Sequence, residues 1–186
     1  SEVIIAPDGD QILFQRKTGD TTNLWLSKLS KIEDSIQITF KGLYNGRAKW
    51  SSESDKIAYL SDRTGSNEIF IYHIGTQETT QLTFNKLREK YISWGPEGGS
   101  LITTMQTDST ENDIYRINTE SKEVSQITVT PDVNESEIAW SPDGLYIAYH
   151  AKIDTYDDIF LLNLASKEVT KVTNGEGYHG EPIFAL

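Results

Sequence analysis

The stretch Trp140–His150, WSPDGLYIAYH, places an aromatic residue, a turn and a short apolar run close together. Pro142 suits the second position of a β-turn because its ring fixes φ, and Gly144 can take the positive φ that other residues resist. The apolar run after the turn has the length of one strand. This stretch therefore predicts the end of one strand, a tight turn and the strand that follows.

Weaker copies of this stretch begin at Ile5, Trp50 and Trp94, and a fifth equivalent position is Phe184. Two further markers keep the same spacing of about 45 residues along the chain. One is the segment beginning at Asn23, Glu68, Asp113 and Asp158, and the other is QITF at 37–40, QLTF at 81–84, QITV at 126–129 and KVTN at 171–174. A fixed period that runs through the chain indicates a repeat architecture.

Each repeat contains four short runs that turn residues separate, which predicts a four-stranded antiparallel sheet. Runs such as KIAYL at 56–60 and IFLLNL at 159–164 are apolar on both sides of the pleat, so both sheet faces need cover. Radial stacking supplies that cover and predicts an all-β fold, a β-propeller with one blade per repeat. We expect blades at 1–40, 41–84, 85–129 and 130–174, and an extra strand at 175–186.

The repeated tryptophans are expected to pack between blades, because their period matches that of the core. We expect almost no helix, and interpret NKLREKY at 85–91 as a loop between blades. The chain has no cysteine, which excludes disulfides and thiolate metal sites. A net charge of −11 argues against nucleic acid and anionic membrane surfaces, and the lack of a long apolar run predicts a soluble chain without membrane insertion.

The stretches WSPDGLYIAYH and LSDRTGSNEIFIYHIGTQETTQLT (60–83) resemble the TolB-type, WD-like (PD40) propeller repeat. The resemblance covers essentially the whole chain and is weaker where Ile5 replaces Trp and where GPEGGS (95–100) replaces Ser-Pro-Asp-Gly. The resemblance implies a propeller fold and a range of roles, including periplasmic binding proteins and the propeller domains of prolyl-oligopeptidase-like enzymes. A periplasmic or extracellular location is implied, and a cytoplasmic one stays open.

Members of this family usually have six or more blades, whereas the chain offers four blades and one further strand. We therefore expect part of a larger propeller, or a half-ring that another copy completes through open blade edges. A closed four-bladed ring, with one terminal strand displaced, is the remaining alternative.

No nucleophile elbow, zinc helix, phosphate loop or dinucleotide fingerprint occurs, so no catalytic residue, cofactor or metal is predicted. His73 and His150 lie within expected strands and are interpreted as structural. The acidic segments DSTEND at 108–113 and DTYDD at 154–158 lack the spacing of a calcium loop. Their last residues, Asp113 and Asp158, recur as Glu68 and Asn23, and are expected to accept hydrogen bonds from backbone amides in the turns.

The candidate site is the rim formed where the chain enters each first strand, because these loops open onto the mouth of a propeller channel. Aromatic, cationic and acidic side chains recur there, with solvated loop residues as the alternative interpretation. The predicted ligand-binding or partner-binding residues are Tyr44, Asn45, Arg47, Arg88, Glu89, Tyr91, Glu135, Glu137, Tyr178, His179 and Glu181.

Three functions remain open at this point. The first is a non-catalytic module that binds a protein or peptide partner or another ligand. The second is the gating portion of a prolyl-oligopeptidase-like serine peptidase. The third is a metal-assisted lyase or hydrolase that acts through His179, Glu135 and Glu181.

Overall fold

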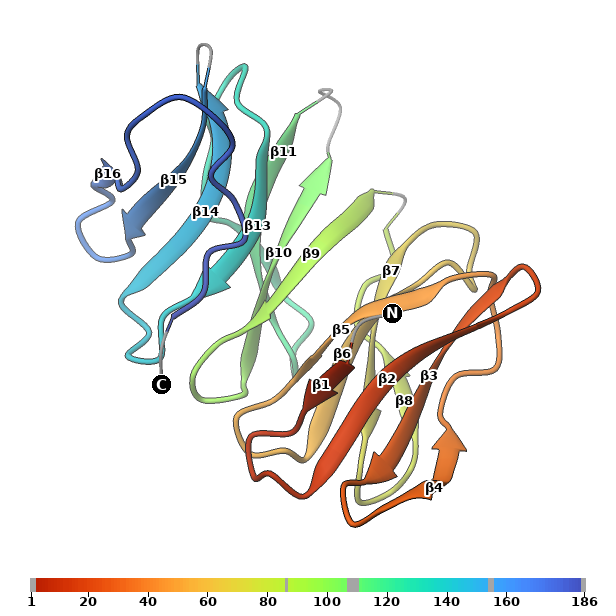
Figure 1. Ribbon diagram of the computed structural model, residues 1–186. Coiled ribbons are helices and arrows are strands. Elements are labelled where there is room, and N and C mark those ends of the chain that lie inside the picture. Colours follow the sequence, from red (N-terminus) through yellow and green to blue (C-terminus); the bar gives the residue numbers. More distant parts are fainter. Residues whose placement is uncertain (1–2, 86, 107–110, 154–155, 185–186) are drawn as a thin grey trace. The chain divides into compact units, whose positions relative to one another are not determined.

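The computed structural model describes residues 3–85, 87–106, 111–153 and 156–184. Within these ranges the strands form four-stranded antiparallel sheets, each built from consecutive strands, and no helix is present (Figure 1). The chain divides into two compact units, residues 1–87 and 88–186, and each holds two blades. The predicted all-β propeller blades are thus confirmed. No described helix has the length and apolar character to cross a membrane.

Unit 1 contains blades 1 and 2. In each blade the strands pair in chain order, first to fourth, through antiparallel ladders. Blade 1 consists of β1 (Val3–Ile5), β2 (Gln11–Thr18), β3 (Thr21–Lys28) and β4 (Lys31–Gln37). Blade 2 consists of β5 (Asn45–Trp50), β6 (Lys56–Ser61), β7 (Glu68–His73) and β8 (Thr79–Gln81).

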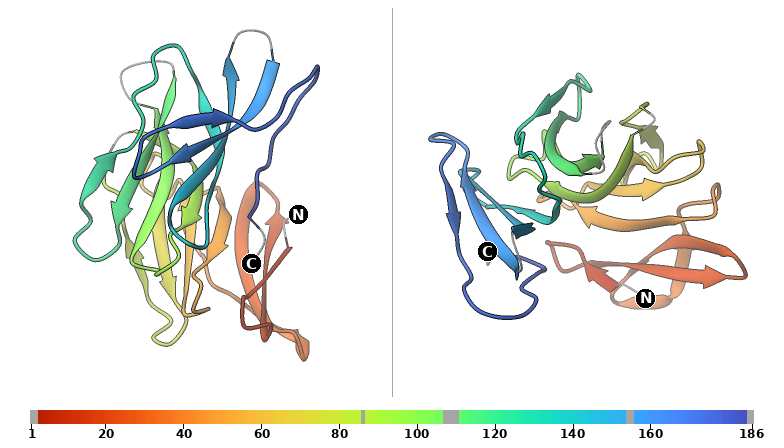
Figure 2. Two further views of the ribbon diagram at one scale, coloured as in Figure 1. Left: turned by 90° about the vertical axis from the view of Figure 1, so that its left-hand side faces the viewer. Right: turned by 90° about the horizontal axis from the view of Figure 1, so that it is seen from above.

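Unit 2 contains blades 3 and 4, which repeat the same order of pairing and are seen from two further sides in Figure 2. Blade 3 consists of β9 (Arg88–Trp94), β10 (Ser100–Gln106), β11 (Asn112–Asn118) and β12 (Val124–Gln126). Blade 4 consists of β13 (Glu135–Trp140), β14 (Tyr146–Ile153), β15 (Tyr156–Asn163) and β16 (Val169–Lys171).

The turn between the first and second strands is the same in all four blades. Its last residue donates its N–H to the carbonyl three positions earlier, for example from Gly144 to Ser141 at 3.0 Å. That residue has positive φ in every case: Gly9, Ser54, Gly98 and Gly144. The conformation predicted for Gly144 is confirmed, and Ser54 adopts it although serine lacks the freedom of glycine.

The seam between blades 1 and 2 is apolar. Leu13 and Leu24 of blade 1 and Ile57 and Tyr59 of blade 2 belong to one buried cluster and are at most 1% exposed. Trp50 joins this cluster and donates its indole N–H toward the carbonyl of Ile4, across the seam, at 3.5 Å. The packing role predicted for the repeated tryptophan therefore holds in unit 1.

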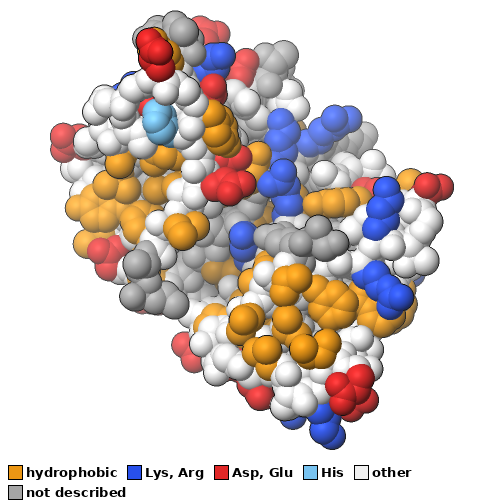
Figure 3. Space-filling model, in the orientation of Figure 1, with side chains coloured by type: hydrophobic (Ala, Val, Ile, Leu, Met, Phe, Trp, Pro, Cys, Tyr) orange, Lys and Arg blue, Asp and Glu red, His pale blue; other side chains and the backbone are white. Residues whose placement is uncertain are grey.

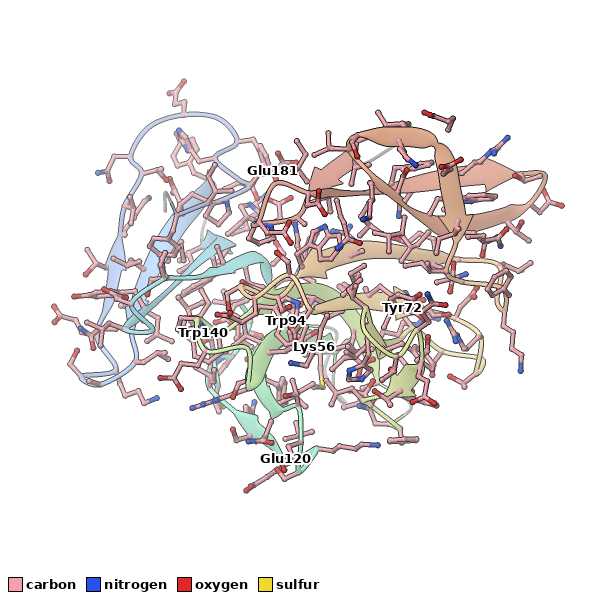
Figure 4. The ribbon with its side chains drawn as sticks, turned by 90° about the horizontal axis from the view of Figure 1, so that it is seen from below. Lys56, Tyr72, Trp94, Glu120, Trp140 and Glu181 are labelled. Carbon is pink, nitrogen blue, oxygen red and sulfur yellow. The ribbon has the colours of Figure 1, made fainter. Side chains whose placement is uncertain are left out.

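The seam between blades 3 and 4 has the same composition, with Ile102 and Ile114 facing Ile147 and Phe160 in one cluster. Trp140 packs against that cluster and contacts blade 3. Its backbone N–H donates to Ser93 Oγ at 3.0 Å, and the guanidinium of Arg116 lies 5.4 Å from its ring. Trp94 and Trp140, on the first strands β9 and β13, are labelled in Figure 4.

Three details differ from expectation. Residues 88–91 are part of β9 and not a loop, because they continue the pairing with β10 across a bulge. The segment 175–184 forms no strand in the described structure, because a first strand is held by its second strand and none pairs with it. In β15 the buried and half-buried side chains alternate, so IFLLNL is fully covered on one face only.

Candidate functional site

The entry to the first strand carries a β-bulge in each unit. The register of β5 against β6 shifts between Gly46 and Lys49, and that of β13 against β14 shifts between Ser136 and Ala139. Within these bulges Arg47 and Glu137 both have φ of 48°. Left-handed backbone is unfavourable for such side chains, and bulges of this kind re-aim a side chain at the end of a sheet.

The predicted rim residues separate into a buried and an exposed group. The residue five positions before each tryptophan is fully buried, which applies to Asn45, Glu89 and Glu135 at 0% exposure. The exposed or half-exposed residues lie one position before or two positions after position 45, 89, 135 or 179. They are Tyr44, Arg47, Arg88, Tyr91, Glu137, Tyr178 and Glu181. The structure therefore buries Asn45, Glu89 and Glu135, and the exposed members of the predicted rim are the residues that remain as binding candidates.

Asn45 joins blade 2 to blade 1. Its side-chain Nδ2 donates to the carbonyls of Lys41 and Thr22, at 3.0 and 3.2 Å, and to Asn23 Oδ1 at 3.2 Å. The loop before it is held by Asp62, whose Oδ1 accepts from the backbone N–H groups of Leu43 and Tyr44 at 2.8 and 3.0 Å. Asn45 is therefore a structural link between the blades of unit 1.

Glu135 joins blade 4 to blade 3, but its side chain accepts hydrogen bonds where that of Asn45 donates them. Its carboxylate accepts from the N–H of Ile114 at 3.2 Å, from Thr130 Oγ1 at 2.9 Å and from Thr128 Oγ1. Burial raises the pKa of Glu135 to about 7, although the hydrogen bonds from Thr128 and Thr130 act in the opposite direction. This buried acid therefore titrates near neutral pH.

His179 occupies the equivalent position after blade 4 and is half-buried. Its Nδ1 lies 3.4 Å from Asp158 Oδ1 and 3.2 Å from the carbonyl oxygen of Asp157. Asp158 also binds Lys171 Nζ at 2.5 Å, and this bond lowers the pKa of Asp158. His179 is thus attached to β15, and no described contact joins it to Glu135.

Three exposed rim residues meet in unit 2. Glu137 Oε2 accepts from the hydroxyl of Tyr178 and from the backbone N–H of Glu181, both at 2.7 Å. The hydrogen bond to Glu137 raises the pKa of Tyr178 to about 12. A Cβ at Gly180 would overlap both the Tyr178 hydroxyl and Glu137 Oε2, so the close approach requires glycine. In unit 1 the exposed rim residues are Tyr44 and Arg47.

A threonine that the sequence analysis did not single out recurs beside these links. In every blade its hydroxyl accepts a hydrogen bond, at 2.8 or 2.9 Å, from one backbone N–H of the third strand. These N–H groups belong to Leu24, Ile69, Ile114 and Ile159. The threonines are Thr39, Thr83, Thr128 and Thr173. Their recurrence in the QITF, QLTF, QITV and KVTN segments was the available signal.

The residue before that amide has a less uniform role than predicted. Asp113 accepts from the backbone N–H of Thr130 at 3.2 Å, as expected of a turn residue. Asn23 and Asp158 accept instead from the hydroxyls of Thr39 and Thr173, at 3.1 and 2.8 Å. The acidic segments at 108–113 and 154–158 lie partly outside the described residues. Among the residues that the structure describes, no group of three or more His, Cys, Asp or Glu could hold a metal ion.

The two strand histidines are satisfied by neighbouring side chains, as predicted. His73 Nε2 lies 3.2 Å from Thr80 Oγ1. His150 lies between Ser136 Oγ, at 2.7 Å, and Asp157 Oδ1, at 3.2 Å, with the ring of Tyr178 against it at 5.1 Å.

The comparisons with known proteins agree with this architecture. No model of a known protein family matches the chain. The Tol-Pal system protein TolB of Ruthia magnifica subsp. Calyptogena magnifica is 31% identical over 80 residues, which are 42% of this chain and 19% of that protein. The chain has the fold of a TolB-type β-propeller repeat protein, and spans about a fifth of the curated relative that it matches.

Three solved structures show the same fold. TolB from Acinetobacter baumannii gives a TM-score of 0.81 at 19% identity, over 97% of this chain and 45% of that chain. The putative TolB from Agrobacterium tumefaciens gives 0.77 at 19% identity, over 90% and 62%. A puromycin-hydrolyzing peptidase of Mycobacterium tuberculosis gives 0.71 at 12% identity, over 91% and 28%.

Proposed function

We propose that the chain is a non-catalytic binding module, whose exposed first-strand rim holds a segment of a protein partner. The curated relative is named a Tol-Pal system protein, and that likeness supports the proposal that this chain takes part in a protein assembly. The binding residues of the proposal are the exposed group alone, Tyr44 and Arg47 in unit 1 and Arg88, Tyr91, Glu137, Tyr178 and Glu181 in unit 2.

The observation that carries the proposal is the repeated left-handed conformation at the rim. Arg47, Glu137 and Glu181 occupy equivalent positions and have φ of 48°, 48° and 55°. A left-handed non-glycine residue is destabilising by about 1–2 kcal/mol, and glycine would remove that cost. Left-handed residues also occur in turns outside the rim, such as Lys167, but at the rim the left-handed residues Arg47 and Glu137 lie within a bulge, which re-aims a side chain at the end of a sheet and so supports a role for the side chain.

The chemistry of the exposed group suits a polypeptide. Tyrosine offers a large apolar surface with a polar end, and arginine and glutamate select charged groups by hydrogen bonding. The exposed charge of the rim is Arg47 in unit 1, whereas unit 2 carries Glu137 and Glu181 as well as Arg88. We therefore propose that each unit binds a partner segment by itself, an acidic one on unit 1 and one of mixed charge on unit 2, and that both segments also carry aromatic or aliphatic residues.

A random peptide library displayed on phage tests this proposal. The immobilised chain is panned, selected peptides are synthesised with a fluorophore, and their dissociation constants are measured by anisotropy. Substitution of Arg47→Ala or Glu137→Ala is expected to weaken binding by about tenfold, the effect of losing one charge-assisted hydrogen bond of about 1.4 kcal/mol.

The matched control is Lys167→Ala. Lys167 is also left-handed, with φ of 62°, but lies in the turn between β15 and β16, outside the rim. Binding is expected to be unchanged in this variant. Selected peptides that bind equally well to all variants would refute the rim as the site.

A second candidate is the propeller portion of a peptidase, which the likeness to the puromycin-hydrolyzing peptidase supports. This candidate predicts a hydrolase segment encoded in the same gene, and the rim would then contact substrate peptides on their way to that segment. The sequence of the complete gene distinguishes the two, because a binding module requires no such segment.

A further inference from the structure

The loop between β4 and β5 exposes two large apolar side chains. Residues 40–43, with the sequence FKGL and here termed the apolar loop, carry Phe40 at 74% exposure and Leu43 at 63%. Lys41 between them is exposed as well. The loop joins β4 to β5 at the outer edge of unit 1 (Figure 1). Single apolar side chains are common on protein surfaces, so a binding role requires that the loop hold these two in a defined place.

Hydrogen bonds fix the backbone of the apolar loop at two of its residues. The Lys41 carbonyl accepts from Asn45 Nδ2 at 3.0 Å. Leu43 donates its N–H to Asp62 Oδ1 at 2.8 Å, and its carbonyl accepts from the N–H of Thr22 at 2.8 Å. The two exposed apolar side chains therefore stand on an ordered backbone, and a partner that buries them does not first have to order the loop.

Gly42 holds the loop directly against the turn that follows β6. Its φ is 86°, a conformation that favours glycine. A Cβ at this position would overlap Asp62 Oδ1 and would lie 3.0 Å from the backbone nitrogen of Arg63. The close approach keeps the backbone on blade 2, while Phe40 and Leu43 on either side of Gly42 stay exposed.

The same combination of residues recurs one period later in unit 1. The sequence FNKL at 84–87 follows blade 2 as FKGL follows blade 1. Phe84 is 68% exposed and Leu87 is half-exposed. A buried apolar position recurs in a repeat protein because the packing of the core requires it. An exposed apolar position has no such requirement, so its recurrence supports a function at the surface.

The surroundings of the apolar loop are basic. From 36 to 52 the sequence holds Lys41, Arg47 and Lys49 and no acidic residue, although the chain has a net charge of −11. All three cations are exposed, and Figure 3 shows Lys and Arg side chains beside exposed hydrophobic ones on unit 1. Asp62 touches the loop, but its Oδ1 accepts two backbone N–H groups. The loop therefore favours an acidic partner.

We propose that the apolar loop anchors an acidic segment of the protein partner on unit 1. Phe40 and Leu43 pack on aliphatic or aromatic side chains of that segment, and Lys41 pairs with one of its carboxylates. This inference rests on the proposed function, because it adds the loop to the exposed rim residues Tyr44 and Arg47, which follow it in the chain.

Two properties of the partner segment follow from this arrangement. A basic segment is repelled by Lys41 and by the exposed cations of β5. An acidic segment without apolar residues leaves Phe40 and Leu43 in water, and so lacks the buried contacts in which a few side chains carry most of the binding energy. The partner segment must therefore carry both acidic and apolar residues.

Two phage libraries of short peptides test this proposal. The peptides of one library contain Asp, Glu, Leu, Phe and Ser, and those of the other contain Lys and Arg in place of the acids. Each library is panned on the immobilised chain, and the dissociation constants of enriched peptides are measured by fluorescence anisotropy. The acidic library is expected to yield peptides whose affinity falls at least about tenfold in both Phe40→Ser and Leu43→Ser. The basic library is expected to yield none that respond to these variants.

The controls separate the loss of an apolar contact from other changes. Ile32→Ser removes a side chain that is 53% exposed on β4, at the end of that strand farther from the loop, and binding is expected to be unchanged. Phe40→Leu keeps an apolar side chain and is expected to bind within about threefold of the wild type. Lys41→Ser is expected to weaken binding at low salt and to have less effect at high salt, because exposed ion pairs are screened. Circular dichroism melting confirms that each variant is folded.

The outcomes distinguish this proposal from that of the rim. Peptides that depend on Arg47 but bind Phe40→Ser and Leu43→Ser at full strength would overturn the role of the loop and leave the rim as the site. Peptides that depend on Phe40 and Leu43 but not on Arg47 would support the loop and refute the rim of unit 1. Failure of the acidic library to enrich any peptide, or loss of a basic peptide in Leu43→Ser, would also overturn the proposal.

Discussion

Asn45 and Glu135 occupy the same position in two seams of the molecule, and both are fully buried. In unit 1 the Asn45 side chain donates to three oxygens of blade 1 and its loop. In unit 2 the Glu135 carboxylate accepts from one amide and two hydroxyls. The comparison teaches that the repeat preserves a buried polar link between blades, whereas the direction of its hydrogen bonds is free to change.

The change of polarity has a consequence for pH. The link in unit 1 is neutral at every accessible pH. The link in unit 2 contains an acid whose pKa burial raises to about 7, with the charge of Asp113 adding to the effect. The two seams, which share an apolar composition, are therefore expected to respond differently to pH.

The largest effect is expected when an acidic side chain replaces Asn45, whose side chain donates the hydrogen bonds of the seam in unit 1. In Asn45→Asp a carboxylate faces the carbonyls of Thr22 and Lys41 and loses every hydrogen bond that Asn45 donates. The new carboxylate keeps one cationic partner, since Asn45 Oδ1 accepts from Arg63 Nη2 at 3.4 Å. The loss of three donated hydrogen bonds should still destabilise the chain by about 3 kcal/mol, and this loss should decrease as the pH falls and the acid takes up a proton. Urea unfolding, with hydrogen exchange of β5 and β6 amides, measures the loss.

The control for this change is Asn174→Asp, the same substitution at an exposed position after β16. Its stability should differ from wild type by less than about 0.5 kcal/mol. Equal losses in the two variants would show that the Asn45 link is not the cause.

The next effect concerns Glu135→Gln. The pKa of Glu135 is about 7 in the folded chain and 4.5 as its ordinary value, so the folded state binds the proton more tightly between these pH values. Stability therefore falls as pH rises from about 4.5 to about 7, by up to about 3 kcal/mol. Glutamine is expected to remove this slope, to raise stability at pH 8 and to leave it unchanged at pH 4.

Urea unfolding at pH 4 and pH 8, with hydrogen exchange of β13 and β14 to localise the change to unit 2, gives the measurement. A variant with the same pH slope as wild type would contradict a titrating Glu135. The links at Asn45 and Glu135 would then differ in the direction of their hydrogen bonds but not in their response to pH.

The fold could be predicted from the sequence because three markers share one period, and because runs such as KIAYL admit only a sheet covered on both faces. The turn conformation at Gly144 followed from residue chemistry. The strand at 88–91 was missed because a run of charged residues hides a pairing that tertiary contacts stabilise.

The rim could be located from the sequence, but not its exposed side chains. Regular alternation places Asn45 on the same face as Arg47 and Lys49, which are exposed. The bulge between Gly46 and Lys49 breaks that alternation and buries Asn45. A bulge depends on the register with the neighbouring strand, and the residue spacing alone does not report it.

A smaller and equal effect is expected in the apolar part of the two seams. Ile57 and Ile147 are equivalent and 0% exposed. Ile57→Val and Ile147→Val should each destabilise their own unit by about 1 kcal/mol through the loss of one buried methylene, independently of pH. Urea unfolding at pH 4 and pH 8 checks both values, and Ile183→Val, at an 89% exposed position, should change neither. A pH dependence in Ile147→Val alone would show that the apolar seams also differ.

The smallest effect concerns the left-handed rim residues, Arg47 in unit 1 and Glu137 in unit 2. Arg47→Gly relieves about 0.5–1 kcal/mol of backbone strain and also loses the interactions of the arginine side chain, so any net stabilisation of unit 1 should stay below about 1 kcal/mol. Glu137→Gly gains the same relief but loses the hydrogen bonds from Tyr178 and Glu181, so its net change should be close to zero. Thermal unfolding measures both variants, and both should lose affinity for the selected peptides. If Arg47→Gly is more stable than the wild type and still binds the selected peptides at full strength, the arginine has no role in binding.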